Sequence, residues 1–123
     1  MQEERRFFLN RIKAIKYAFN GFRILITSEK SIIAQVIIAF IMTIIGFLMN
    51  ISATEWLFQI FAIGLILVAE SLNTAIEKMA DFIHPEYHQQ IGRIKDISAG
   101  AAFFAAIIAV IIGLIIYVPK FIA

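Results

Sequence analysis

The chain has 123 residues, of which 61% are hydrophobic and only 16% are charged, and its mean hydropathy is +0.86. Ordinary soluble domains are about half apolar and about a quarter charged, so this composition excludes a disordered chain and argues against a soluble globular one. The length corresponds to one domain, residues 1–123, with no room for a separate soluble catalytic module. The net charge of +2 does not indicate nucleic acid binding, and the absence of cysteine excludes disulfides and thiolate metal sites.

Residues 1–30 predict an amphipathic helix that lies on a membrane surface with its cationic face toward anionic headgroups. A signal peptide is a poorer interpretation, because the charged stretch is too long and no cleavage motif of small residues follows it. Apolar side chains recur there at spacings of three and four, and they alternate with the cations Arg5, Arg6, Arg11, Lys13, Lys16, Arg23 and Lys30.

Three apolar runs follow, over residues 31–49, 56–76 and 97–118. Each is long enough to cross about 30 Å of hydrocarbon as a helix. A short polar turn, 50–55, separates the first two runs, and a polar stretch, 78–96, separates the second from the third. We therefore expect an all-α membrane protein with an N-terminal amphipathic surface helix and three transmembrane helices.

The distribution of positive charge predicts how the chain is oriented. Ten of the eleven Lys and Arg residues lie in the N-terminal segment or in the 78–96 loop, and only Lys120 lies on the other side. Because cytoplasmic segments carry the excess of Lys and Arg, the N-terminus and this loop are expected in the cytoplasm. Helical spans in a bacterium indicate a multi-pass protein of the cytoplasmic (inner) membrane.

Four polar side chains lie at the end of the second apolar run and just beyond it. Glu70, Asn73, Glu77 and Asp81 fall within about 80° of one another around a helix, so they form one polar stripe. A carboxylate near the bilayer centre costs about 3 kcal/mol, and less near the interface, which favours a functional role. The alternative is structural: Glu77 and Asp81 would be a solvated helix end, and Asn73 would be an interhelical hydrogen-bonding residue.

The residue types near the stripe indicate phosphoryl transfer. Glu29 precedes the first apolar run, and Gly92-Arg93-Ile94-Lys95-Asp96 precedes the third. Carboxylates beside cations can hold Mg²⁺ between one or two carboxylates and substrate phosphates. No glycine-rich phosphate-binding loop is present, so metal and cationic side chains would have to replace it. Glu70, partly desolvated, is a candidate general base, whereas His84 and His88 without a third ligand are a weak metal signal.

The stretch Glu70-Ser71-Leu72-Asn73-Thr74-Ala75-Ile76-Glu77 resembles the E-x-x-N-[ST]-A-I-E signature of a known family. This family comprises the small three-span bacterial diacylglycerol kinases and their undecaprenol kinase relatives. The resemblance continues through Asp81, Glu86-Tyr87-His88 and Lys95-Asp96. It implies a homotrimer whose active sites lie at the cytoplasmic face between neighbouring subunits, and transfer of the γ-phosphoryl group of ATP to a lipid hydroxyl.

The resemblance also implies roles for individual residues. Glu29 and Glu77 look like the Mg²⁺-binding carboxylates, Glu70 looks like the catalytic base that meets the substrate, and Asn73 looks like its positioning partner. The residues expected to contact the nucleotide are Arg11, Tyr17, Glu29, Glu77, Tyr87, His88, Arg93, Lys95 and Asp96.

The acceptor lipid is less sharply indicated. Where the diacylglycerol kinase branch carries an arginine and a second glutamate, this chain has Ile33, Ala34 and Gln35, and we assign Gln35 to the acceptor side. Pro85 looks like the undecaprenol kinase branch, whereas Gly92-Arg93 looks like the diacylglycerol kinase branch. We expect diacylglycerol as acceptor, giving phosphatidic acid for phospholipid metabolism, with undecaprenol as the alternative.

A small oligomeric transporter is a remote alternative from another functional class, since intramembrane glutamates also mark ion pathways. Transporters need acidic residues near the middle of the membrane and on more than one span. Here the acidic residues cluster at one end of the second run, and the first and third runs carry none.

Overall fold

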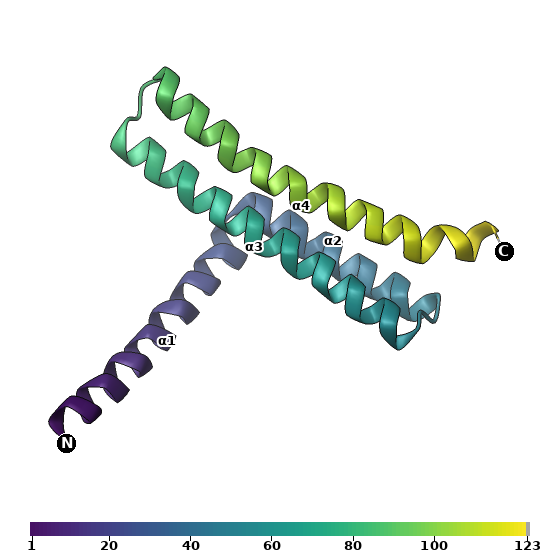
Figure 1. Cartoon of the computed structure of the whole chain (residues 1–123), viewed down its shortest axis with the longest axis horizontal. Coiled ribbons are helices and arrows are strands. Elements are labelled where there is room, and N and C mark those ends of the chain that lie inside the picture. Colours follow the sequence, from purple (N-terminus) through teal and green to yellow (C-terminus); the bar gives the residue numbers. More distant parts are fainter. Residues whose placement is uncertain (123) are drawn as a thin grey trace.

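The computed structural model describes residues 1–122, which form four α-helices and no strand. The helices are α1 (Gln2–Ser28), α2 (Lys30–Leu48), α3 (Ala53–Ile83) and α4 (Gln89–Ile122). Helices α2, α3 and α4 run alongside one another as a bundle, and α1 leaves the bundle at a steep angle (Figure 1). The expectation of an all-helical protein is confirmed.

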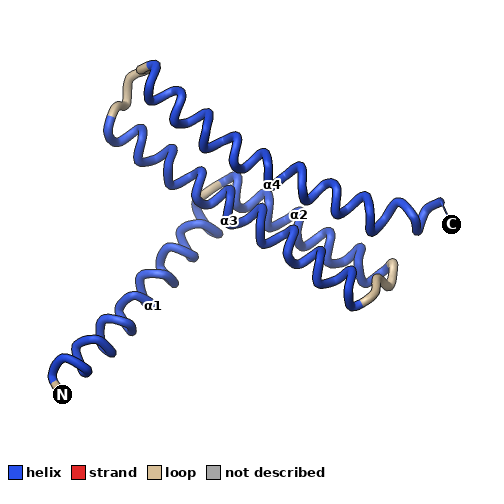
Figure 2. The backbone as a smooth tube through the Cα atoms, in the orientation of Figure 1, coloured by secondary structure: helices blue, strands red, loops and turns tan. Residues whose placement is uncertain are grey.

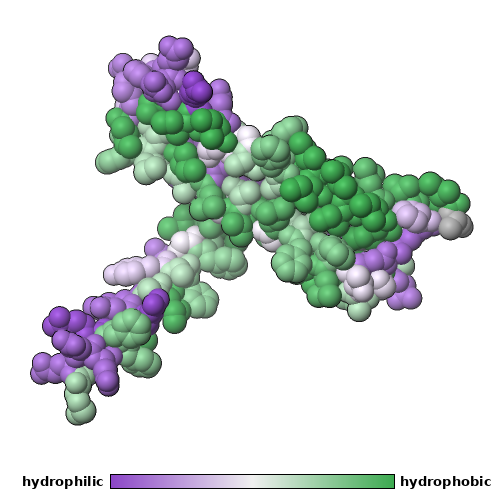
Figure 3. All heavy atoms as spheres, in the orientation of Figure 1, coloured by the Kyte–Doolittle hydropathy of each residue, from purple (hydrophilic) through white to green (hydrophobic). Residues whose placement is uncertain are grey.

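Helices α2, α3 and α4 are each long and apolar enough to cross a membrane. The three expected apolar runs lie on these helices in order. Figure 3 shows a broad hydrophobic surface on the visible face of the bundle, with hydrophilic side chains gathered at the far end of α1 and at the two ends of the bundle. The chain is therefore a multi-pass membrane protein.

None of the residues of helix α1 is buried. The helix ends where Glu29 adopts an extended conformation, with φ −93° and ψ 109°, and α2 begins at the next residue. The carbonyl of Glu29 already accepts the first hydrogen bond of α2, from the Ile33 amide at 2.9 Å. The single extended residue Glu29 thus changes the direction of the chain between α1, which lies outside the bundle, and α2, the first helix of the bundle.

The turn between α2 and α3 is tightly built. Asn50 has φ 52°, a left-handed conformation that asparagine tolerates better than most residues. Ser52 and Glu55 form a capping box: the Ser52 hydroxyl accepts from the Glu55 amide at 3.2 Å, and the Glu55 carboxylate accepts from the Ser52 amide at 2.9 Å. These bonds satisfy backbone donors at the start of α3 that would otherwise have no partner.

Helices α3 and α4 lie side by side along most of their length (Figure 2). Small residues are buried on these two helices, namely Ala62, Thr74 and Ala80 on α3 and Ser98, Ala102 and Ala105 on α4. Small side chains let two helix backbones approach closely, which is how helices associate in lipid, where no hydrophobic force drives them together. The larger buried side chains Ile51, Ile116 and Tyr117 gather at the end next to the 50–52 turn.

The connection between the second and third spans is shorter than expected. The polar stretch 78–96 was expected to be a loop, but α3 continues to Ile83 and α4 begins at Gln89, so only residues 84–88 are non-helical. Charged residues do not break a helix that extends beyond the membrane, whereas proline restricts the residue before it. His84, which precedes Pro85, has φ −147° and ψ 88° and ends α3.

The unequal lengths of α2 and α3 determine how far the α3–α4 hairpin extends. Helix α3 has 31 residues and α2 has 19. At about 1.5 Å per residue, α3 is longer than α2 by about 18 Å. The α3–α4 hairpin therefore projects past the point where α1 joins α2 (Figure 1).

Candidate functional site

The polar stripe of α3 is directed partly toward α4. The Asn73 amide nitrogen Nδ2 donates to Glu77 Oε1 at 3.3 Å, and the Ser98 hydroxyl of α4 donates to Asn73 Oδ1 at 2.7 Å. One turn further, Lys95 of α4 forms an ion pair with Asp81. The stripe is thus joined to the first turns of α4 at two levels.

Exposure differs along the stripe. Glu70 and Asn73 are half-buried, whereas Glu77 and Asp81 are exposed. Within residues 1–122 the Glu70 carboxylate accepts no hydrogen bond from another side chain. Glu77 Oε1 accepts the Asn73 bond, and Oε2 has no side-chain partner in the same range.

Glu29 is brought to α3 by the break between α1 and α2. Its carboxylate lies 3.1 Å from Lys78 Nζ, and Lys78 directly follows Glu77 in the chain. The Glu29 side chain is only 18% exposed, whereas the Lys78 side chain is 66% exposed. The junction of the first two helices and the polar stripe therefore lie in one region, which the sequence alone suggested only by analogy.

Magnesium uses few protein ligands and keeps phosphates or water in its other positions, so one or two carboxylates can hold it together with phosphate oxygens. Among the described residues, no group of three or more acidic or histidine side chains is arranged to hold a metal by itself. Glu29 and Glu77, the carboxylates expected to bind a metal, would therefore need phosphate oxygens or water to complete its coordination.

The nucleotide candidates of the hairpin lie close to the stripe. Arg93, Lys95 and Asp96 are on the first turns of α4, and of these Arg93 and Asp96 are exposed. In the connection, Tyr87 is exposed and its ring lies next to Gly92. His88 Nδ1 accepts a hydrogen bond from the Gln90 amide at 3.1 Å, which orients the ring.

The other three candidates lie elsewhere. Arg11 and Tyr17 are exposed on α1. The Arg11 guanidinium carbon Cζ lies 5.1 Å from the centre of the Phe7 ring. The structure does not bring these two residues to the stripe within one chain. Gln35 is half-buried on α2 and lines a groove between α2, α3 and α4.

This groove has a volume of about 480 Å³ and an almost entirely apolar lining. Ile66 and Leu67 line it on α3, one helical turn before Glu70. Gln59 and Tyr117 line it toward the other end of the bundle. The groove thus runs along the membrane-spanning part of the bundle, and its lining on α3 ends about one helical turn before Glu70.

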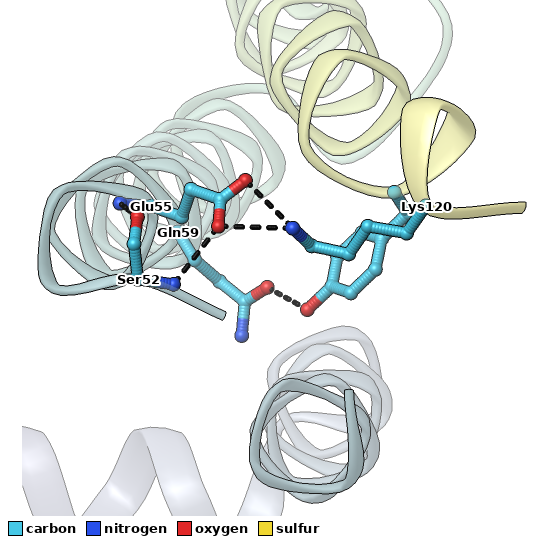
Figure 4. A network of polar contacts seen from close by, with 5 residues as sticks. Ser52, Glu55, Gln59 and Lys120 are labelled. Carbon is cyan, nitrogen blue, oxygen red and sulfur yellow. Dashed lines mark hydrogen bonds and ion pairs between the residues drawn. The ribbon is translucent and has the colours of Figure 1, made fainter. Parts of the chain in front are cut away.

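A second polar network, which the sequence analysis did not identify, lies at the opposite end of the bundle (Figure 4). Lys120 Nζ lies 3.1 Å from both carboxylate oxygens of Glu55. The Tyr117 hydroxyl donates to Gln59 Oε1, and Gln59 Nε2 donates to the Met42 carbonyl at 3.0 Å. These bonds join α2, α3 and α4, and a glutamine within an apolar run was the sequence signal for them.

Ser98, which contacts the polar stripe at Asn73, is the other residue that the sequence analysis did not identify. It follows Lys95 and Asp96 by less than one turn and is only 6% exposed. A lone serine in a run of small residues resembles ordinary helix packing, so only its contact with Asn73 distinguishes it.

Comparison with known proteins finds a matching sequence family. The sequence model of the prokaryotic diacylglycerol kinase family matches residues 16–117, a range that contains every site candidate except Arg11. Undecaprenol kinase of Bacillus subtilis is 43% identical over 77 residues, which are 63% of this chain and 63% of that protein. Diacylglycerol kinase of Escherichia coli K12 is 32% identical over 100 residues, covering 81% of this chain and 82% of that protein. Diacylglycerol kinase of Haemophilus influenzae is 28% identical over 101 residues, covering 82% of this chain and 86% of that protein.

Proposed function

The chain belongs to the prokaryotic diacylglycerol kinase family, and we propose that it transfers the γ-phosphoryl group of ATP to the hydroxyl of diacylglycerol, giving phosphatidic acid. The observation that carries this proposal is the half-buried Glu70 beside the hydrogen-bonded Asn73–Glu77 pair, one helical turn beyond the lining of an apolar groove. A membrane alcohol and a water-soluble nucleotide have to meet at such a boundary. This arrangement supports a lipid kinase better than a transporter, because the acidic side chains gather at one end of the bundle.

In the proposed reaction Glu70 is the general base. The lipid hydroxyl oxygen attacks the γ-phosphorus, the bond from that phosphorus to the β–γ bridging oxygen breaks, and ADP leaves. The hydroxyl proton passes to the Glu70 carboxylate. Most of the acceleration comes from placing the hydroxyl in line with the phosphate, since phosphoryl transfer depends mainly on positioning and charge stabilisation.

Glu29 and Glu77 are proposed to hold Mg²⁺ with the nucleotide. The ion would supply positive charge that neutralises the negative charge developing on the phosphates. Asn73 orients the Glu77 carboxylate through its amide. Lys78 keeps Glu29 at α3 through their ion pair.

The nucleotide is proposed to lie against the start of α4 and the 84–88 connection. Arg93 and Lys95 would neutralise phosphate charge, with Asp96 beside them. Tyr87 and His88 would contact the rest of the nucleotide. Arg11 and Tyr17 remain weaker proposals, because α1 carries them away from the stripe within one chain (Figure 1).

Undecaprenol is the second candidate acceptor. The specific observation in its favour is the 43% identity to an undecaprenol kinase, although that alignment is shorter than the one with diacylglycerol kinase. Both lipids are hydrophobic alcohols, so an apolar groove suits either. Gln35, which lines the groove, is proposed to contribute to the choice.

We further propose a homotrimer in the bacterial cytoplasmic membrane, with sites shared between neighbouring subunits, as the family resemblance implies. The N-terminus and the 84–88 connection would face the cytoplasm. This orientation is supported by the cations on α1 and at the start of α4, which follow the positive-inside rule. It also puts the stripe on the side where ATP is available.

The test is phosphate transfer from labelled ATP by purified protein in mixed micelles, run in parallel with diacylglycerol and with undecaprenol. Glu77→Gln serves as the inactive variant. Glu55→Gln, which changes a carboxylate at the opposite end of the bundle, serves as the matched active control. Transfer to diacylglycerol above the Glu77→Gln level supports the proposal, and transfer to undecaprenol alone assigns the other acceptor. No transfer to either lipid by folded protein refutes a lipid kinase with these acceptors.

A further inference from the structure

Ser98 makes an unusual contact for a helical hydroxyl in this protein. Thr27, Thr43 and Ser71 each donate to the backbone carbonyl four residues earlier in their own helix. Ser98 instead donates across the helix interface to Asn73 Oδ1 at 2.7 Å. It is also nearly completely buried, so water does not compete for the bond.

The direction of this bond matters because an amide has two different ends. A carboxylate only accepts hydrogen bonds, so Asn73 has to present its NH₂ group to Glu77. The amide oxygen then points away from Glu77, toward α4, where it needs a donor. The Ser98 hydroxyl supplies that donor, and the two bonds together favour one of the two orientations of the amide.

We propose that Ser98 is a positioning residue, which holds the Asn73 amide so that its NH₂ group faces Glu77 Oε1 and leaves Oε2 for the cation. This inference rests on the proposed lipid kinase function. Ser98 acts through Asn73 and touches neither the nucleotide nor the lipid. Removing its hydroxyl leaves the Asn73 amide free to rotate, and the Glu77 carboxylate is then less often in its binding orientation.

The first test needs neither metal nor substrate. The chain contains only four asparagines, Asn10, Asn20, Asn50 and Asn73, so ¹⁵N-asparagine labelling of the full-length protein in detergent micelles gives four pairs of side-chain amide signals. Ser98→Ala should shift the Asn73 signals and leave the other three in place. Thr43→Ala, which removes a hydroxyl bonded only within its own helix, is the matched control and should shift none of them. An Asn73 pair that does not move in Ser98→Ala overturns the proposal.

The second test measures the magnesium dependence of phosphate transfer. Ser98→Ala removes the hydrogen bond to Asn73, the residue that orients the Glu77 carboxylate. Loss of this one bond should raise the half-saturating Mg²⁺ concentration about fivefold. The turnover at saturating Mg²⁺ should fall less than that, and Thr43→Ala should match wild type in both quantities. A purely structural role for Ser98 would lower the amount of active protein without changing the half-saturating concentration, and that result overturns the proposal. Inactive wild-type protein would instead refute the proposed function, so the two failures are distinguishable.

Discussion

The close approach of α2 to the start of α3 makes a stability prediction at Gly46. A Cβ atom at this position would lie 2.7 Å from Cη2 and 2.9 Å from Cζ2 of Trp56, and 3.2 Å from Cδ1 of Ile51. Trp56 is a rigid ring packed against the Ile51, Ile116 and Tyr117 cluster, and Ile51 is itself buried. The neighbours therefore cannot make room without repacking the end of the bundle.

Gly64 provides a matched comparison, because it is also within a helix but has no atom within 4 Å of an added Cβ. Alanine is favoured over glycine in a helix by about 1 kcal/mol at both positions, so this contribution cancels between the variants. What remains is the cost of overpacking, typically about 1–3 kcal/mol. We expect Gly46→Ala to be less stable than Gly64→Ala by that amount.

The assay is reversible unfolding in detergent micelles, followed by circular dichroism and by tryptophan fluorescence. Trp56 is the single tryptophan of the chain, so its emission reports directly on the predicted clash. The emission of the folded protein should change in Gly46→Ala and stay at the wild-type position in Gly64→Ala. Equal stabilities together with unchanged emission would refute the geometry proposed for this turn.

Three further outcomes are expected. Tyr117→Phe removes the donor to Gln59 Oε1, and Gln59 is only 5% exposed. The unfolding free energy should therefore fall by about 1–2 kcal/mol. An unchanged value in the same unfolding assay would contradict this bond. Glu70→Gln should abolish phosphate transfer while ATP binding, measured by equilibrium dialysis, persists; retained turnover would exclude Glu70 as the base. Chelation with excess EDTA should stop transfer and added Mg²⁺ should restore it, whereas activity that survives chelation would contradict the metal role of Glu29 and Glu77.

Much of this protein can be predicted from local patterns. The apolar runs specify three helices because a membrane-spanning chain has to satisfy its backbone hydrogen bonds internally. The spacing of Glu70, Asn73, Glu77 and Asp81 places them on one face because helical periodicity is a local property. The error at residues 78–96 arose because polarity was taken to indicate a loop. Polarity marks only where the chain leaves the membrane, and the helix ends where Pro85 restricts its neighbour.

Tertiary structure decided which side chains meet. Lys78 pairs with Glu29, Lys95 with Asp81, and Ser98 with Asn73, and each pair joins segments at least 14 residues apart. Tyr117 reaches Gln59 across 58 residues at the opposite end of the bundle. Such pairings depend on how the helices are rotated and aligned against one another, which is set by the fit of many small buried residues together. Helical periodicity therefore predicts the face on which a polar residue lies, and the packing of α3 against α4 determines its partner.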